Sequence, residues 1–140
     1  MQKLLIPVDG SAHACRAVQD AIAQLQGGAA LELHLLNVQP ALDGLAQSFV
    51  RREDLDAYRR EEAAAALASA RGMLDAAGIA HVCHVAVGRT ADTILRFIEE
   101  KGMNGVLMGS HGHGNLLGAL LGSVAREVSA RAQVPVRLVK

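Results

Sequence analysis

The chain has few aromatic residues and no excess of charge of either sign. Its 140 residues include one tyrosine, two phenylalanines and no tryptophan, and 14 lysines and arginines balance 14 aspartates and glutamates. A neutral chain lacks the basic face from which DNA- and RNA-binding proteins gain affinity, and three aromatic rings are too few for a base-stacking surface. These two shortages argue against nucleic acid as a ligand.

Cysteine is scarce, and so are long apolar runs. Cys15 and Cys83 form no Cys-x-x-Cys pair, which is typical of buried thiols in a reducing compartment. The apolar N-terminal stretch is interrupted by Pro7 and Asp9 and does not resemble a secretory signal. The uncharged stretch 102–125 is too rich in glycine for one continuous membrane-spanning helix. We therefore expect a soluble, cytoplasmic protein that does not enter a membrane.

Apolar runs alternate with amphipathic segments along the whole chain, and residues 41–51, which fit neither pattern, are expected to form a loop. The sequence predicts strands over residues 3–8, 31–38, 79–87, 105–108 and 134–139, and helices between Ser11 and Gly27 and over 52–77, 91–101 and 123–132. Strands that alternate with helices of this length indicate a mostly parallel sheet with helices on both faces. Without a linker or a repeat, residues 1–140 are expected to form a single doubly wound α/β domain.

Each predicted helix carries apolar residues at helical spacing on one side. The residues expected to face the core are Cys15, Val18, Ile22 and Leu25 in the first helix, Leu67, Ala70 and Leu74 in the second, Ile94, Phe97 and Ile98 in the third, and Val124 and Val128 in the fourth. Ser11 precedes the first helix as a candidate N-cap, and Gly27-Gly28 ends that helix.

The richest candidate site follows the predicted fourth strand. Here Gly109-Ser110-His111-Gly112 begins a glycine-rich segment, and Gly122-Ser123 opens the next helix. In open α/β sheets, ligands bind at the carboxyl ends of strands, glycine lets the backbone approach a ligand, and a helix N-terminus offers free N–H groups. The pattern favours an anion, most of all phosphates, although the same glycines would also suit an ordinary surface turn.

No lysine, arginine, aspartate or glutamate lies between Lys101 and Arg126. The segment therefore does not match the phosphate loop GxxxxGK[ST], and the turn after the first strand, Pro7 to Ser11, lacks a GxGxxG fingerprint. A nucleotide held here would depend on backbone amides, hydroxyls and a divalent cation. Because the segment also lacks a carboxylate base, we expect no fast turnover and, at most, slow ATP hydrolysis.

Over its whole length the chain resembles the universal stress protein family. Gly109-Ser110-His111-Gly112, nine further residues and Gly122-Ser123 match that family's nucleotide motif G-x2-G-x9-G-[S/T]. The first strand's ending, Pro7-Val8-Asp9-Gly10-Ser11, and the closing Val134-Pro135-Val136 also match. The resemblance implies a five-stranded parallel sheet in the order 3-2-1-4-5 (the adenine nucleotide alpha hydrolase-like arrangement), ATP binding with Mg²⁺ or Mn²⁺, and a homodimer.

The resemblance also implies roles for single residues. The implied contacts are Asp9 near the adenine, with Pro7 and Val8 as the pocket floor, the backbone of Val38 at the adenine edge, Met108 and Gly109 beside the ribose, and Gly112, Gly122, Ser123 and Val124 at the phosphates. His111 and His113 lie in the same segment and are further candidates for phosphate contact. Many relatives place arginine or lysine between the two motif halves, whereas residues 113–121 contain neither.

The remaining reactive side chains do not form a recognisable catalytic or metal site. In a strand, His81 and Cys83 face one side and His84 the other, so the three cannot converge on one ion. Ser11 and Ser123 suit helix caps better than nucleophiles, because no His–Asp pair stands at a recognisable spacing. We expect no catalytic residue and no protein-bound metal site, and the charged run 51–62 is expected to face solvent.

Three functions stay open from the sequence. The leading one is an ATP-binding stress-response or signalling module without fast turnover. A slow ATP hydrolase or phosphotransferase would need a base and charge neutralisation that the glycine-rich segment does not supply. A nucleotide-free interaction protein would leave the glycines unused. In each case the fifth strand, an edge in the implied order, is expected to join a homodimer through Val134, Val136, Leu138 and Val139.

Overall fold

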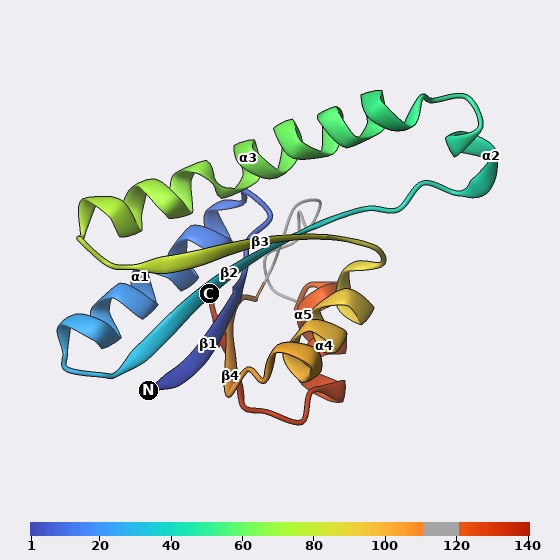
Figure 1. The fold of residues 1–140 in the computed structure, drawn as a ribbon. Coiled ribbons are helices and arrows are strands. Elements are labelled where there is room, and N and C mark those ends of the chain that lie inside the picture. The colour runs from blue at the N-terminus through green and yellow to red at the C-terminus, as the bar shows by residue number, and fades with distance from the viewer. Residues whose placement is uncertain (111–120) are drawn as a thin grey trace.

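The five strands of the computed structural model form one parallel sheet (Figure 1). The structure describes residues 1–110 and 121–140. The strands are β1 (Gln2–Pro7), β2 (Leu31–Gln39), β3 (His81–Val87), β4 (Gly105–Gly109) and β5 (Val136–Val139). They lie in the order β3-β2-β1-β4-β5, and every neighbouring pair is parallel. The predicted doubly wound α/β fold and its strand order are confirmed.

Helices cover both faces of the sheet (Figure 1). One face carries α1 (Ala12–Gln26) and α3 (Arg52–Ala76), and the other carries α4 (Thr90–Lys101) and α5 (Ser123–Arg131). Because successive strand residues point to opposite faces, β2 contributes Leu35 to the first layer of the core and Leu36 to the second. The doubly covered sheet explains why residues 4–6 of β1 and 106–108 of β4 are uninterrupted apolar runs.

The centre of the α1 interface consists of small residues, which differs from the prediction. Of the four apolar residues expected to face the core, only Val18 is fully buried. The other buried positions are Ala14, Ala17 and Ala21, while Cys15, Ile22 and Leu25 lie half-buried beside them. A helix that lies close to a sheet leaves room only for small side chains on its innermost line, and the larger ones pack along its margins. In α4, Phe97 is half-buried in the same way.

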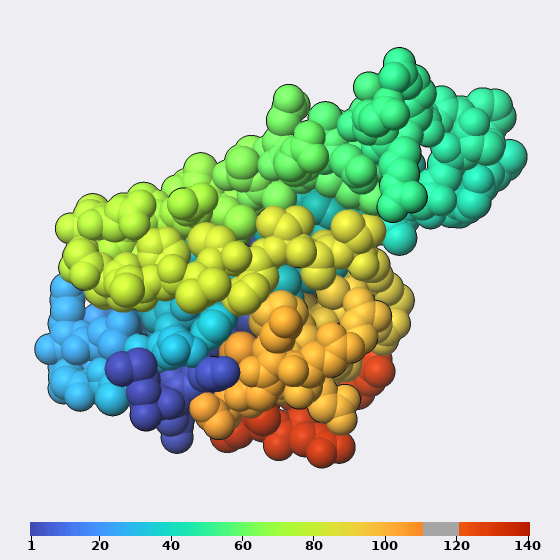
Figure 2. Space-filling model, viewed as in Figure 1, coloured from blue at the N-terminus to red at the C-terminus, as the bar shows by residue number. Residues whose placement is uncertain are grey.

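Residues 41–51, expected to be a loop, contain the short helix α2 (Gly44–Gln47), whose N-terminus is capped by Asp43 Oδ1 accepting from the Ala46 N–H at 2.7 Å. With the first half of α3, this segment projects beyond the body of the molecule (Figure 2). The buried residues of α3 all lie further along, at Ala63, Leu67, Ala70 and Leu74. The charged run 51–62 contains no buried residue, as predicted.

Helix length and apolar character together decide whether a segment can cross a membrane. Within residues 1–110 and 121–140, no helix is both long enough and apolar enough to do so. The longest one, α3, has 25 residues and is rich in arginine and glutamate.

Candidate functional site

The carboxyl ends of β1 and β4 lie side by side at the centre of the sheet. The ladder pairs Leu4 with Gly105 and Leu5 with Val106, so both strands run in the same direction towards this edge. The ends of these two strands therefore come together where the strand order reverses. They consist of Pro7 with the two residues after it, and of Gly109 with the residue after it. This is the position at which open α/β sheets bind ligands.

The two halves of the glycine motif meet at the end of β4. The Gly122 N–H donates to the Ser110 carbonyl at 2.8 Å, and the Ser110 N–H donates to the carbonyl of Val139 at 2.8 Å. Ser110 is only 1% exposed, so this junction is part of the folded core. Gly109-Ser110 and Gly122-Ser123 are thus brought together, as the motif requires. His111, Gly112 and His113 lie outside the described residues.

The N-terminus of α5 begins at this junction. Gly122 is its N-cap residue, with φ −64° and ψ 156°, and no side-chain hydrogen bond among the described residues caps the helix. Helix α1 differs, because its N-cap Ser11 accepts a hydrogen bond from the Ala14 N–H at 3.2 Å. The prediction of a cap role is confirmed for Ser11 and wrong for Ser123, which is the first helical residue. The first N–H groups of a helix have no partner within it, and helix ends of this kind are common places for anions to bind.

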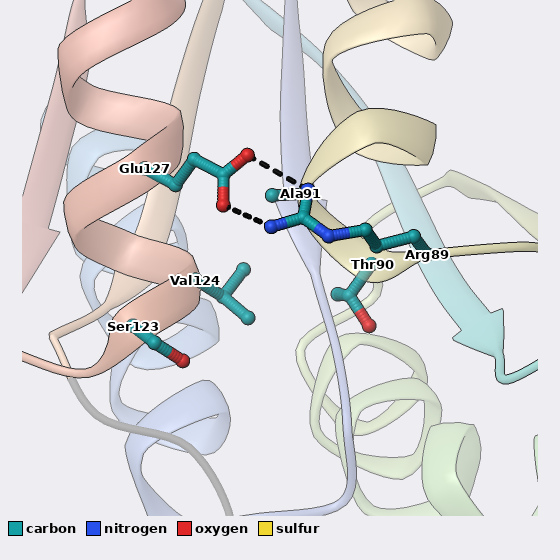
Figure 3. Close-up of a pocket in the computed structure, with 6 residues that line it drawn as sticks. All are labelled: Arg89, Thr90, Ala91, Ser123, Val124 and Glu127. Atoms are coloured by element: carbon teal, nitrogen blue, oxygen red, sulfur yellow. Dashed lines mark hydrogen bonds and ion pairs between the residues drawn. The ribbon is translucent and has the colours of Figure 1, made fainter.

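A pocket of about 200 Å³ lies between the N-termini of α4 and α5 (Figure 3). Its lining residues are Arg89, Thr90, Ala91, Ser123, Val124 and Glu127. Two of them, Ser123 and Val124, were predicted as phosphate contacts. Sites for whole small-molecule ligands have volumes of roughly 300–1,000 Å³. This pocket has room for phosphate groups rather than for a complete nucleotide.

Two charged residues of this pocket, Arg89 and Glu127, belong to a network of four charged side chains that the sequence analysis did not predict. Arg89 contacts both carboxylate oxygens of Glu127, at 2.8 and 2.5 Å, and Asp92 Oδ1 at 3.0 Å. Arg131 joins the same carboxylates, at 2.5 Å to Glu127 and 2.8 Å to Asp92. Two pairs in the network are close in sequence, Arg89 with Asp92 three residues apart and Glu127 with Arg131 four apart, and only these spacings could have indicated it. The Arg89–Glu127 contact joins residues 38 positions apart, which no local pattern reveals.

The network shifts the protonation equilibria of its members. Hydrogen bonds from Arg89 and then Arg131 hold the pKa of the Glu127 carboxyl below its usual value, and Arg131 does the same for the pKa of Asp92. The same bonds, that of Glu127 first, raise the pKa of Arg89. Two positive charges therefore balance two negative charges, and the hydrogen bonds favour the ionised form of both carboxylates.

The residues predicted around the adenine and ribose lie at the ends of β1, β2 and β4. Val8 and Met108 are buried in the core, so they have only backbone atoms to offer a ligand. Pro7 and Val38 are half-buried, and Asp9 is exposed. The Asp9 Oδ1 atom accepts a hydrogen bond from the Ser11 N–H at 2.9 Å, which fixes the turn leading into α1.

Two buried polar side chains beside this region were not predicted. The Asn37 amide donates to the Val8 carbonyl at 2.8 Å, and the Gln39 amide donates to Asn37 Oδ1 at 2.6 Å. Both side chains are buried, and the Asn37 bond fixes the end of β1 against β2. Their signal in the sequence was a pair of polar residues at alternate positions at the end of β2.

Gly109 has a structural role that the motif does not reveal. A Cβ atom on this residue would lie 2.7 Å from the Cβ and 2.8 Å from the carbonyl carbon of His13 in the first turn of α1. The absence of a side chain here is thus required by the close packing of α1 on β4, whether or not a ribose lies nearby.

A second polar cluster lies on the α4 side of the sheet, away from the pocket. His34 Nδ1 and His84 Nε2 are 2.9 Å apart, and His34 Nε2 contacts Glu32 Oε2 at 2.7 Å. Neither contact of His34 was predicted from the sequence. Burial, followed by the neighbouring charges of His34 and Lys101, lowers the pKa of His84. No group of three or more His, Cys, Asp or Glu side chains within the described residues is arranged to hold a metal ion.

Comparison with known proteins gives consistent matches along the whole chain. The sequence model of the Universal stress protein family matches residues 1–140. Universal stress protein YxiE of Bacillus subtilis is 30% identical over an alignment of 148 positions, which covers 99% of this chain and 98% of that protein. Universal stress protein Slr1230 of Synechocystis is 28% identical, and the match spans 96% of this chain but 41% of that longer protein.

Solved structures share the fold. The hypothetical protein MJ0577 of Methanocaldococcus jannaschii superposes with a TM-score of 0.83 at 30% identity, over 99% of this chain and 95% of that one. The universal stress protein from Archaeoglobus fulgidus in complex with dAMP superposes with a TM-score of 0.70 at 23% identity, over 100% and 98% of the two chains.

Proposed function

The chain belongs to the universal stress protein family, and from this premise we propose that it is a nucleotide-binding stress-response or signalling module that binds ATP at the N-terminus of α5. The observation that carries the proposal is the junction at which the Gly122 N–H reaches the Ser110 carbonyl. It places both halves of the glycine motif beside a helix end that no described side chain caps. A related structure from Archaeoglobus fulgidus contains dAMP, which supports an adenine nucleotide as the ligand class.

In this proposal the phosphates lie against the backbone of Gly109, Gly122, Ser123 and Val124, with the Ser123 hydroxyl as a further donor. Gly112, His111 and His113, which lie outside the described residues, are further proposed phosphate contacts. The adenine lies at the strand ends, between the backbone of Val38 and the turn formed by Pro7, Val8 and Asp9, and the ribose lies beside Met108. The pocket of about 200 Å³ next to Ser123 takes the phosphate tail.

A divalent cation, Mg²⁺ or Mn²⁺, completes the proposed site. The arginine that lines the pocket, Arg89, is already in contact with Glu127 and Asp92. Residues 102–125 contain neither lysine nor arginine, and one arginine cannot offset the charge of a triphosphate, so a divalent ion bound through phosphate oxygens is needed as well. ATP affinity measured by calorimetry is therefore expected to fall steeply when EDTA replaces the metal. Equal affinity with and without EDTA would contradict this part of the proposal.

We propose binding without fast turnover. The glycine-rich segment contains no carboxylate, but Glu127, which lies outside that segment, lines the pocket. Its pKa is held low by Arg89 and Arg131, which makes it a weak base for activating a water molecule. This leaves slow hydrolysis as the second candidate, with Glu127 as the residue to test. Single-turnover assays of radiolabelled ATP on wild type and Glu127→Gln would separate the two functions.

The proposed assembly is a homodimer joined along β5. In the described residues β5 pairs with β4 alone, so its other edge is open. The side chains of Val136, Leu138 and Val139 are only half-buried in the single chain. Arg137, the charged residue of the strand, is drawn back to Asp20 of α1 by a 3.1 Å contact. A two-fold related copy would cover these apolar side chains and the open edge.

The experiment that tests the proposed function is identification of the small molecule released when the purified protein is denatured. ATP or another adenine nucleotide in near-stoichiometric amount, detected by mass spectrometry, is the expected result. Protein that releases no nucleotide, and that takes up none when ATP and Mg²⁺ are added, would instead support a nucleotide-free interaction protein.

A further inference from the structure

Arg89 lies where it could contact either a neighbouring helix or a ligand. It precedes the first turn of α4, and its guanidinium crosses to Glu127 on α5 over the pocket (Figure 3). Its side chain is 61% exposed, so the group is open to solvent on its outer side. Among the described residues that line the pocket, Arg89 and Glu127 are the two that carry charge.

The position of Glu127 relates this ion pair to the proposed phosphate site. Glu127 follows Ser123 by four residues on α5, which is one helical turn or about 6 Å along the axis. The guanidinium that it binds is therefore held within a side chain's reach of the uncapped helix end. The two parallel N–H···O contacts between Arg89 and Glu127 have the geometry with which guanidinium groups also bind phosphates.

We propose that Arg89 is the cationic contact for the polyphosphate tail of the nucleotide, and that Glu127 holds it until a nucleotide displaces this carboxylate. The inference rests on the proposed function and adds the basic group that residues 102–125 lack. It also assigns a specificity: the site distinguishes nucleotides by the length and charge of the phosphate tail.

The rest of the network makes this exchange of partners feasible. When Arg89 turns to a phosphate, Glu127 keeps its contact with Arg131 at 2.5 Å, so its charge is not left without a counter-ion. Arg131 likewise keeps Asp92 at 2.8 Å. Ion pairs between exposed side chains are weak in water, so opening the Arg89–Glu127 pair costs little free energy. A contact between Arg89 and a tail with three or more negative charges stabilises the complex by more than this cost.

The alternative is that Arg89 only connects α4 to α5. A purely structural ion pair would affect the stability of the fold and would act equally on every nucleotide. A contact to the tail would instead act on ATP and leave AMP nearly unchanged, because the single phosphate of AMP does not extend into the pocket. The ratio of ATP to AMP affinity separates these two roles, since a change in fold stability does not alter it.

The test is calorimetric titration of the full chain with ATP and with AMP, both with Mg²⁺, for wild type, Arg89→Met and Glu127→Gln. The matched control is Arg96→Met in α4, the helix that Arg89 precedes. The Arg96 side chain is 59% exposed and pairs with Glu100, and neither residue lines the pocket. Thermal melts of each variant show that it is folded at the titration temperature.

We expect Arg89→Met to weaken ATP binding by about tenfold and AMP binding by less than twofold, as the loss of one charge-assisted contact predicts. Glu127→Gln removes the competing carboxylate and should strengthen ATP binding by roughly threefold relative to AMP. An unchanged ATP-to-AMP ratio in Arg89→Met, or an equal change in Arg96→Met, would overturn the inference and leave the proposed function standing. A wild-type protein that binds neither nucleotide would overturn both.

Discussion

Replacing Gly109 with alanine tests how closely α1 packs against β4. An added Cβ would lie 2.7 Å from the Cβ of His13, 2.8 Å from its carbonyl carbon and 2.9 Å from its carbonyl oxygen. Non-bonded carbon atoms approach to about 3.5–4.0 Å at their optimal separation. Two of these three neighbours are backbone atoms, so relief requires α1 itself to move rather than a side chain to rotate.

The cost of that movement is set by the interface behind it. Helix α1 contacts the sheet through Ala14, Ala17, Val18 and Ala21, all of which are at most 4% exposed. Lifting the first turn opens gaps around these residues, and overpacking of this kind costs about 1–3 kcal/mol. For a domain of this size, each kcal/mol corresponds to roughly 3–6 °C in the melting temperature.

Gly105 supplies the matched control from the same strand. A Cβ there would meet the Pro135 carbonyl oxygen at 3.5 Å and a Leu4 methyl at 3.7 Å, which are ordinary contacts. Neither glycine has a positive φ, so both substitutions leave the backbone unstrained. In urea denaturation we expect Gly109→Ala to be destabilised by about 1–3 kcal/mol and Gly105→Ala to stay close to wild type. Equal stability of the two variants would refute the packing argument.

Two other parts of the structure yield further predictions. Burial lowers the pKa of His84, so near the usual value of 6.5 and somewhat below it the unfolded chain binds more protons than the native chain. Stability should therefore fall as the pH drops from about 6.5 towards 5. His84→Phe should flatten that part of a pH series of urea midpoints, and an unchanged slope would count against it. At the β5 edge, Val136→Asp should convert a dimer to a monomer in light scattering, and a wild-type protein that is already monomeric at micromolar concentration would exclude the proposed assembly.

Local pattern predicted the central strands β1 and β4 because a sheet covered on both faces makes them continuously apolar, and the strand order followed from the motif resemblance. The same reasoning chose the larger apolar residues of α1 over its alanines. Periodicity shows which side of a helix is apolar, but it does not show how near the neighbouring element lies. The contact between Gly109 and the first turn of α1 shows how close α1 lies to β4, and at this distance small side chains such as Ala17 and Ala21 occupy the innermost positions.

The meeting of the two motif halves was predicted from the sequence, whereas contacts between distant residues that share no motif were missed. Gly109-Ser110 and Gly122-Ser123 stand at a motif spacing, and the structure joins them through one hydrogen bond. The Arg89–Glu127 contact spans 38 positions and the His34–His84 contact 50, and no local periodicity relates such residues. Ser123 was expected to cap α5, but the helix begins at Ser123 itself, one residue earlier than a cap at Ser123 requires.

The central claim is that adenine nucleotide binds where Gly122 opens α5, and titration of the Gly122→Val variant with ATP and Mg²⁺ tests it most directly. The φ of −64° at Gly122 is accessible to every residue, so valine adds bulk at the proposed phosphate site without requiring a new backbone conformation. We predict saturable binding of one ATP per chain in the wild type and in Gly105→Ala, and no measurable binding in a Gly122→Val protein whose circular dichroism matches that of the wild type. Unchanged ATP affinity in folded Gly122→Val would contradict the account.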